Sequence, residues 1–287
     1  MGYLLCNEVV RELDVAAQCD LAAGLGYQGL EIAPFTLGAE PHRLTPGRRA
    51  GVRRAAADAG IRIGALHWLL VAPEGLSITS ADGGVRARTL DVMERLVELC
   101  ADLGGRVVVH GSPKQRVLPV DDRAGAVARA TEAFALAGRV AEAAGVCYCI
   151  EPLSRQETEF VTSVAEAVHI VEEVASPALR TMVDCRAARL SETEGVPELI
   201  ERYVPTGMIR HVHVNDRNGR APGQGSDPFA AVLAALHAVG YRGDVGVEPF
   251  TYVPDGPTSA ARAMGYLAGI EEALAAFPNG RPPGVST

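Results

Sequence analysis

The sequence predicts one α/β domain folded as a (β/α)8 barrel, the TIM barrel class. Short β-rich apolar segments alternate with helix-like segments along the chain, and this order favours a parallel sheet covered by helices. Eight such units fill most of the 287 residues, close to the roughly 250 residues of a typical barrel. An open doubly wound sheet, the runner-up, would need a glycine fingerprint after the first strand. The segment "CNEVVRELD" contains none.

The eight predicted strands are short runs rich in aliphatic and β-branched residues. Glycine or polar residues bound most of them, as is usual for strands in a buried sheet. In chain order they span residues 3–10, 29–35, 61–68, 106–111, 146–153, 179–185, 209–216 and 243–250.

Helices are predicted between these strands, most clearly at residues 89–103, 123–144, 164–174 and 228–239. Thr162 or Ser163 is expected to cap the third of these helices, and Asp227 precedes a proline at the start of the fourth. Glycines that end a helix accept the left-handed conformation cheaply. Such glycines stand just before five of the strands, at Gly26, Gly60, Gly104, Gly145 and Gly240.

Composition limits the classes of partner. The formal net charge of -8 opposes sequence-independent binding to nucleic acid or to an anionic membrane. No apolar run reaches the roughly 18 residues that span a bilayer. The start "MGYLLCNEVVREL" indicates a first strand rather than a signal peptide, so we expect a cytoplasmic protein. The six cysteines include no CxxC pair and are interpreted as buried, reduced thiols. The barrel domain is expected over residues 1–276, followed by a Pro/Gly-rich tail, 277–287.

Four polar residues end the last four predicted strands: Glu151, Asp184, His213 and Glu248. Their separations of 33, 29 and 35 residues each match about one strand–helix unit. The carboxyl ends of barrel strands open onto the face that carries active sites, so these side chains are expected to converge. Three carboxylates and one imidazole suit Mn2+, Mg2+ or Co2+ better than a thiolate-loving metal. A cation would also relieve the repulsion among the carboxylates.

Further polar and aromatic residues surround the predicted mouth of the barrel. Loop arginines and a loop glutamate can bind the oxygen atoms of a polar substrate, and an aromatic side chain suits the face of a sugar ring. Loop solvation and simple core packing are the alternative interpretations. The predicted substrate-binding residues are Glu157, His67, Trp68, His110, His211, Arg217 and Arg220.

Six segments carry a family resemblance along essentially the whole chain: "ALHWLL", "VVVHGSPKQR", "IEPLSRQETEF", "MVDC", "HVHVNDRNGRAPGQG" and "VGVEPF". They resemble the sugar phosphate isomerase/epimerase superfamily, the xylose-isomerase-like TIM barrels. The sequence looks most like the ketose 3-epimerase branch, in which the fifth-strand glutamate is followed by an Asn/Ser-Arg pair and a second glutamate. Here these are Glu151, Ser154, Arg155 and Glu157.

This resemblance implies an Mn2+-type site made by the four strand-end residues. It also implies that Glu151 and Glu248 are the catalytic pair that removes and returns a proton, and that Glu157 contacts substrate hydroxyls. Arg217 or Arg220 is expected to reach the substrate, and dimers or tetramers are common in the superfamily. One departure is Ala187, where the epimerases place a substrate-holding histidine. It bears on the choice of sugar more than on the metal chemistry.

The expected function is therefore a metal-dependent sugar epimerase or isomerase that abstracts a proton next to a carbonyl and passes through an enediolate. The alternative is a lyase or dehydratase that acts on a ketopolyol or keto-glycoside with the same site. A barrel that binds without turnover is a third hypothesis. The related endonuclease branch needs more histidine ligands and a basic face, and it fits poorly with seven histidines and a net charge of -8. The expected partner is a small carbohydrate or polyol.

Overall fold

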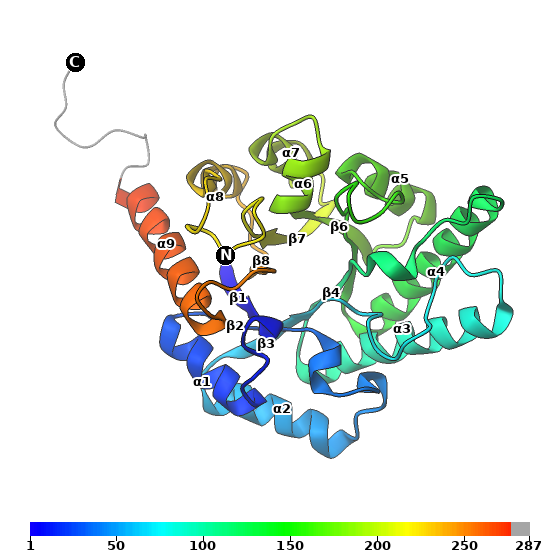
Figure 1. Ribbon diagram of the computed structural model, residues 1–287, viewed down its shortest axis with the longest axis horizontal. Helices are drawn as coiled ribbons and strands as arrows, with labels where there is room; N and C mark the ends of the chain where they lie inside the picture. The colour runs from blue at the N-terminus through cyan, green and yellow to red at the C-terminus, as the bar shows by residue number, and fades with distance from the viewer. Residues whose placement is uncertain (277–287) are drawn as a thin grey trace.

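The structure, a computed structural model that describes residues 1–276, contains a closed barrel of eight parallel strands (Figure 1). Each strand pairs with its neighbour in the chain, and β8 returns to pair with β1, with Leu4 opposite Gly246. The predicted (β/α)8 fold is confirmed. The strands are β1 (Gly2–Cys6), β2 (Gly29–Ile32), β3 (Arg62–Leu66), β4 (Val107–His110), β5 (Cys147–Ile150), β6 (Leu179–Asp184), β7 (Ile209–Val214) and β8 (Asp244–Val247).

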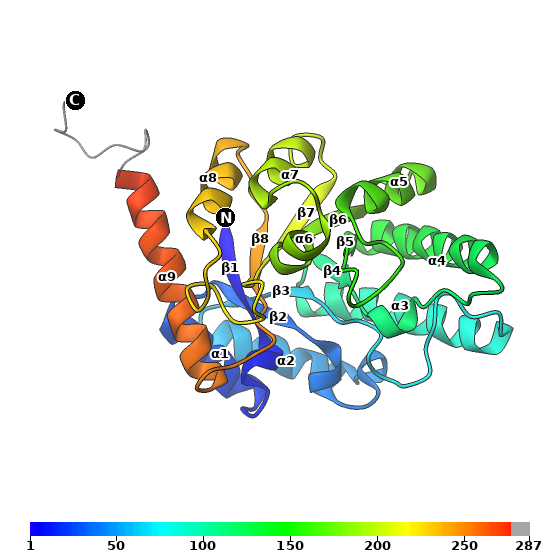
Figure 2. The same cartoon turned by 45° about the horizontal axis from the view of Figure 1, so that its top comes forward.

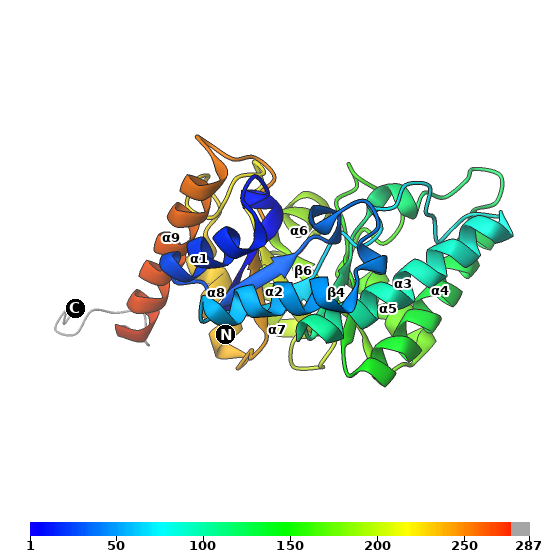
Figure 3. The same cartoon turned by 90° about the horizontal axis from the view of Figure 1, so that it is seen from below.

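Helices surround the barrel on its outer face. Figures 1 and 2 show α3, α4 and α5 grouped on one side of the barrel, with α8, α9 and α1 on the other. The view from below shows the same arrangement (Figure 3). The helices are α1 (Val15–Leu25), α2 (Pro46–Asp58), α3 (Gly83–Leu103), α4 (Arg123–Ala144), α5 (Val164–Val174), α6 (Cys185–Ser191), α7 (Val196–Tyr203), α8 (Phe229–Ala238) and α9 (Gly256–Ala276).

Most predicted helix boundaries agree with the structure, and α4 and α5 have the predicted bounds. Helix α3 begins six residues before the predicted start at residue 89, because Asp82 caps it by accepting from the backbone N–H groups of Gly84 and Val85. Of the two predicted caps for α5, Ser163 is the one used. The five predicted glycine stops all have positive φ, between 67° and 93°.

The first predicted strand is shorter than expected. It ends at Cys6, and Asn7–Val10 form a 3-10 helix, η1. The side chain of Asn7 accepts a hydrogen bond from the backbone N–H of Ala33 and donates to Gln18 and Thr36. These bonds attach the turn to the end of β2. They bring Glu8, which follows Asn7, to the rim of the barrel.

Apolar side chains fill two layers, one inside the barrel and one between the strands and the helices. Val109, Cys149 and Met182 form a small cluster apart from the larger core. The six cysteines, all among the described residues, are free thiols. In residues 1–276, no helix combines the length and apolar character that crossing a membrane requires. The predicted tail, 277–287, lies outside the described residues.

Candidate active site and metal centre

The four strand-end residues converge at one rim of the barrel. Glu151 and Glu248 follow β5 and β8, Asp184 ends β6, and His213 is the penultimate residue of β7. All four are buried, and each offers a ligand atom within 4.8 Å of the others. His213 Nδ1 lies 3.0 Å from Glu248 Oε2 and 3.6 Å from Glu151 Oε1. This nitrogen has no hydrogen-bond partner in the described part of the chain, so the group fits a divalent cation with oxygen and nitrogen ligands.

The pKa values of Glu248, Asp184 and His213 are all raised, which indicates that the site favours added positive charge. Burial, with a smaller contribution from the neighbouring Glu151, raises the pKa of Glu248 to about 8 and that of Asp184 to about 6. Burial would lower the pKa of His213, but Glu248 and Glu31 hold it well above its usual value. Protons therefore gather where a cation would otherwise neutralise the carboxylates.

Metal affinity is expected to depend on pH for this reason. A proton on Glu248, whose pKa is raised to about 8, must leave before that carboxylate binds a cation. The apparent affinity for Mn2+ should rise from pH 6 to pH 8 by up to about tenfold per pH unit for each proton displaced. Titration calorimetry in two buffers of different ionisation enthalpy measures both the affinity and the protons released. An affinity that is flat over this range would contradict the expectation.

Three neighbouring groups position Glu151 and Asp184. Arg116, which is fully buried, donates from both terminal nitrogens to the backbone carbonyl of Glu151, at 2.9 Å each. Asn215 Nδ2 donates to Asp184 Oδ2 at 2.7 Å, and the backbone N–H of Ala187 donates to Asp184 Oδ1 at 2.6 Å. Neither Arg116 nor Asn215 was predicted from the sequence.

His67 and Trp68 both lie beside Glu248. The indole Nε1 of Trp68 donates to Glu248 Oε1 at 2.9 Å, and His67 Nε2 lies 3.8 Å from the same oxygen. His67 Nε2 is closer to Glu8 Oε2, at 2.9 Å. Burial would lower the pKa of His67, but Glu8 raises it to about 9. The rings of Phe35 and Phe250 flank Trp68, with centroids 6.1 and 6.3 Å away. This side of the mouth is therefore aromatic and carries one cationic imidazole.

The structure does not place His110 at the predicted substrate site, so its predicted role as a substrate ligand is corrected. Its Nδ1 is 2.6 Å from the Tyr148 hydroxyl, and its ring packs edge-on against Phe134 of α4. Burial, followed by the charge of Arg116, lowers the pKa of His110 to about 3. The side chain thus lies in the packing between the strands and the helices, turned away from the four strand-end residues. His110 is therefore not one of the residues at the mouth of the barrel.

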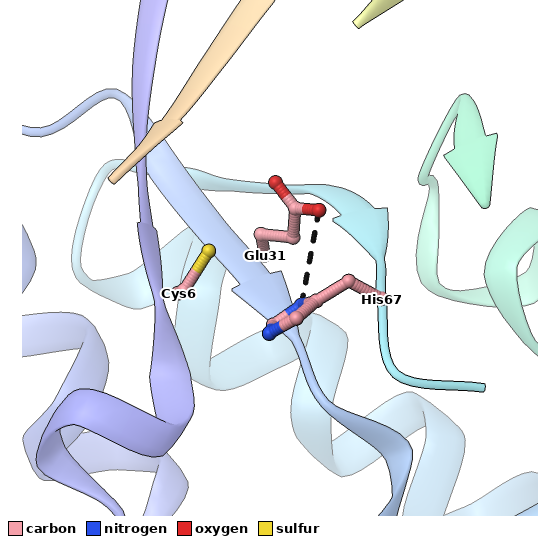
Figure 4. Close-up of side chains that lie close together, drawn as sticks. All are labelled: Cys6, Glu31 and His67. Carbon is pink, nitrogen blue, oxygen red and sulfur yellow. Dashed lines mark ion pairs between the residues drawn. The ribbon is translucent and has the colours of Figure 1, made fainter. Parts of the chain in front are cut away.

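His211 also points away from the mouth, toward Glu31, a residue that was not predicted from the sequence. Glu31 of β2 is fully buried, and its Oε2 lies 2.8 Å from His211 Nε2. Its Oε1 lies 2.9 Å from His213 Nε2. Figure 4 shows Glu31 inside the barrel with Cys6 and His67 beside it, the dashed line marking its ion pair with His67 at 3.7 Å. An acid within the otherwise apolar run "GLEI" was the signal that could have revealed it.

The predicted loop residues have different partners. Glu157 accepts from the backbone N–H of Ser154 and lies 3.2 Å from Arg186 Nη1, whose guanidinium packs over Phe250. Arg217 donates through Nε to the buried Asp227 at 2.8 Å, so Asp227 binds this arginine rather than capping α8. Arg220 donates its backbone N–H to Asn218. Arg186, which was not predicted from the sequence, therefore lies beside the predicted substrate-binding residue Glu157.

Gly111, directly after β4, provides a test of the geometry around Glu151. A Cβ atom at this position would overlap Glu151 Oε2. Gly111→Ala is therefore expected to displace that carboxylate and to weaken Mn2+ binding by about tenfold or more. Gly24→Ala is the matched control, because a Cβ there meets nothing within 4 Å. Equal Mn2+ affinity in both variants and in the unaltered protein, measured by titration calorimetry, would show that Glu151 does not need this space.

The fold and the site together define a class: (β/α)8 barrels with three acids and one histidine at the carboxyl ends of successive strands. The chain matches the xylose isomerase-like TIM barrel family over residues 19–270 and belongs to that family.

Several named relatives of this chain are ketose epimerases. The chain is 30% identical to the L-ribulose 3-epimerase of Mesorhizobium japonicum, in an alignment that covers 70% of this chain and 66% of that protein, just under two thirds. It is 28% identical to the D-psicose 3-epimerase of Agrobacterium fabrum, over 79% of this chain and 76% of the relative. A crystal structure of D-psicose 3-epimerase in the presence of D-fructose aligns with a TM-score of 0.80 and 23% identity, covering 98% of this chain and 100% of that one. These relatives are epimerases, a class of isomerase, and the prediction of an enzyme of this class is confirmed.

Proposed function

We propose that this protein is a divalent-metal-dependent epimerase of ketoses. The observation that carries the proposal is the convergence of Glu151 and Glu248 in one buried group with Asp184 and His213. Two carboxylates are thereby available beside a cation site, which is what the removal and return of a proton next to a carbonyl requires. The ketose 3-epimerase names of the relatives support the same activity.

The residues around the site have distinct proposed roles. Glu151, Asp184, His213 and Glu248 would hold the cation. A bound Mn2+ supplies the positive charge that polarises the substrate carbonyl and makes the neighbouring C–H acidic. One of the two glutamates takes the proton from one face of the carbon, and the other returns a proton to the opposite face. The enediolate of the substrate carries its negative charge only between the removal of the first proton and the return of the second.

The proposed substrate contacts lie on two sides of the mouth. Trp68 donates to Glu248 Oε1 and orients that carboxylate, while its indole face is available to an apolar face of the sugar. Glu157, held by Ser154 and Arg186, would accept hydrogen bonds from substrate hydroxyls. Ala187 stands where the resemblance places a substrate-holding histidine, so we expect the choice of sugar to differ from that of the epimerases.

Proton exchange into ketoses tests this function. The Mn2+-loaded enzyme is incubated in D2O with D-psicose, L-ribulose and D-fructose, and NMR follows the products. We expect deuterium at C3 together with inversion at that carbon. A product that has lost water, or a cleaved glycosidic bond when a keto-glycoside is offered, would indicate the lyase instead. Absence of exchange into every ketose and keto-glycoside would overturn the proposal.

A cytoplasmic location and a dimeric or tetrameric assembly stay predictions.

A further inference from the structure

Glu31 occupies a position that the proposed chemistry does not by itself explain. It is fully buried on β2, and its two carboxylate oxygens lie against different histidines of β7. Oε2 is 2.8 Å from His211 Nε2, and Oε1 is 2.9 Å from His213 Nε2. His67 Nδ1, at 3.7 Å, is beyond hydrogen-bonding distance (Figure 4). The carboxylate therefore accepts two good hydrogen bonds, both from histidines of one strand.

The two nitrogens of His213 face opposite directions. Nε2 points at Glu31, whereas Nδ1 points at Glu248 Oε2, 3.0 Å away, and at Glu151 Oε1, 3.6 Å away. A neutral imidazole carries one proton, and only the nitrogen without it has a lone pair for a cation. An ionised carboxylate is an acceptor alone, so it fixes the proton on the nitrogen that faces it.

We propose that Glu31 is the positioning residue that keeps the proton of His213 on Nε2 and presents the Nδ1 lone pair to the cation. This role rests on the proposed metal centre. In this proposed role Glu31 acts only through His213 and is not itself a ligand of the cation. His211 complements this role, because it donates to the second oxygen of Glu31 and so fixes the plane of the carboxylate.

The surrounding backbone is shaped to admit this arrangement. Gly246 of β8 packs against it, and a Cβ at that position would lie 2.6 Å from Glu31 Oε2 and 2.7 Å from His213 Cδ2. The pairing of β2 with β3 shifts register between Leu30 and Glu31. The pairing of β6 with β7 shifts between Thr181 and Met182, next to His211. Such irregularities re-aim side chains near functional sites.

The alternative role for Glu31 is plain stability, as the acceptor for two buried imidazoles. The two roles differ in what a substitution changes. Loss of a purely stabilising contact lowers the melting temperature and leaves metal affinity in the folded fraction unchanged. Loss of a residue that orients a metal ligand typically weakens metal binding by about 10–100-fold.

The test compares Mn2+ binding in Glu31→Ala, Glu31→Gln and Cys149→Ala, with calorimetry for affinity, electron paramagnetic resonance for free Mn2+, and a thermal melt for stability. Cys149 is the matched control, because it is fully buried on a barrel strand but outside this network. We expect Glu31→Ala to bind Mn2+ about 10–100-fold more weakly. Glu31→Gln keeps an oxygen that accepts from His213 and should lose clearly less. Cys149→Ala should melt lower with unchanged affinity.

Gly246→Ala keeps Glu31 and His213 while forcing them apart, so it keeps the inference testable if Glu31→Ala fails to fold. It should also weaken Mn2+ binding by about tenfold or more. Unchanged Mn2+ affinity in the folded Glu31 and Gly246 variants, with lower melting temperatures, would overturn the positioning role. If the unaltered protein binds no Mn2+, the proposed metal centre itself fails, and this result is distinct from the first.

Discussion

Glu248→Gln is expected to reduce kcat by about 10²–10⁴-fold, the usual loss when a positioned acid or base is removed. The amide cannot take a proton from carbon, and it is a poorer ligand for a hard cation than a carboxylate. Glu151→Gln should have an effect of the same size, because both glutamates share the proposed proton transfer and the cation. Steady-state rates at saturating Mn2+ and ketose, with metal content measured on the same samples, separate loss of chemistry from loss of metal.

Glu172→Gln on the exposed face of α5 is the control for these substitutions, and it should retain full activity. A variant that keeps more than about a tenth of the rate has lost less than the expected factor of about 10²–10⁴. If either Glu151→Gln or Glu248→Gln does so, the two-glutamate scheme is wrong.

Arg116→Met is expected to lower the free energy of unfolding by about 3 kcal/mol. The guanidinium is fully buried and donates twice to the carbonyl of Glu151. Burial lowers the pKa of Arg116 to about 10, so it remains charged at neutral pH. Its removal leaves a buried carbonyl without a donor and takes a positive charge away from the Glu151 carboxylate. Urea unfolding monitored by circular dichroism measures the change.

Two further substitutions make the Arg116 result specific. Arg116→Lys should recover little, because a single ammonium cannot reproduce the two-pronged contact. Arg123→Met breaks a surface pair with Glu159 and should cost less than about 1 kcal/mol. Similar decreases in the free energy of unfolding for Arg116→Met and Arg123→Met would mean that the buried contact of Arg116 stabilises the fold no more than a surface ion pair does.

The barrel was predictable because its signal repeats. Each unit shows an apolar strand, a helix and often a glycine stop, and the agreement of eight units outweighs the ambiguity of any one. The same repetition located Glu151, Asp184, His213 and Glu248, since the carboxyl end of a strand can be found without knowing its neighbours. The start of α3 was missed because its first turn has no apolar periodicity, and Asp82 alone marks it.

Residues that support the site were harder to find, because they depend on contacts between segments far apart in the sequence. Glu31 meets His213 across 182 residues, and Arg116 reaches Glu151 from the loop after β4. His110 was assigned to the wrong side because neighbouring residues of a strand face opposite ways. Its neighbour Val109 clusters with Cys149 and Met182, whereas His110 packs against α4.

Closure of the barrel between its first and last strands has a consequence for the order of events during synthesis. His213 cannot adopt its final contact with Glu248 until β8 has left the ribosome and paired with β1. The hydroxyl of Tyr3 on β1 also awaits Glu271 of α9, its partner at 2.6 Å. All eight strands must therefore emerge before the four proposed metal ligands can come together, so we expect a cation to bind only after β8 has been synthesised.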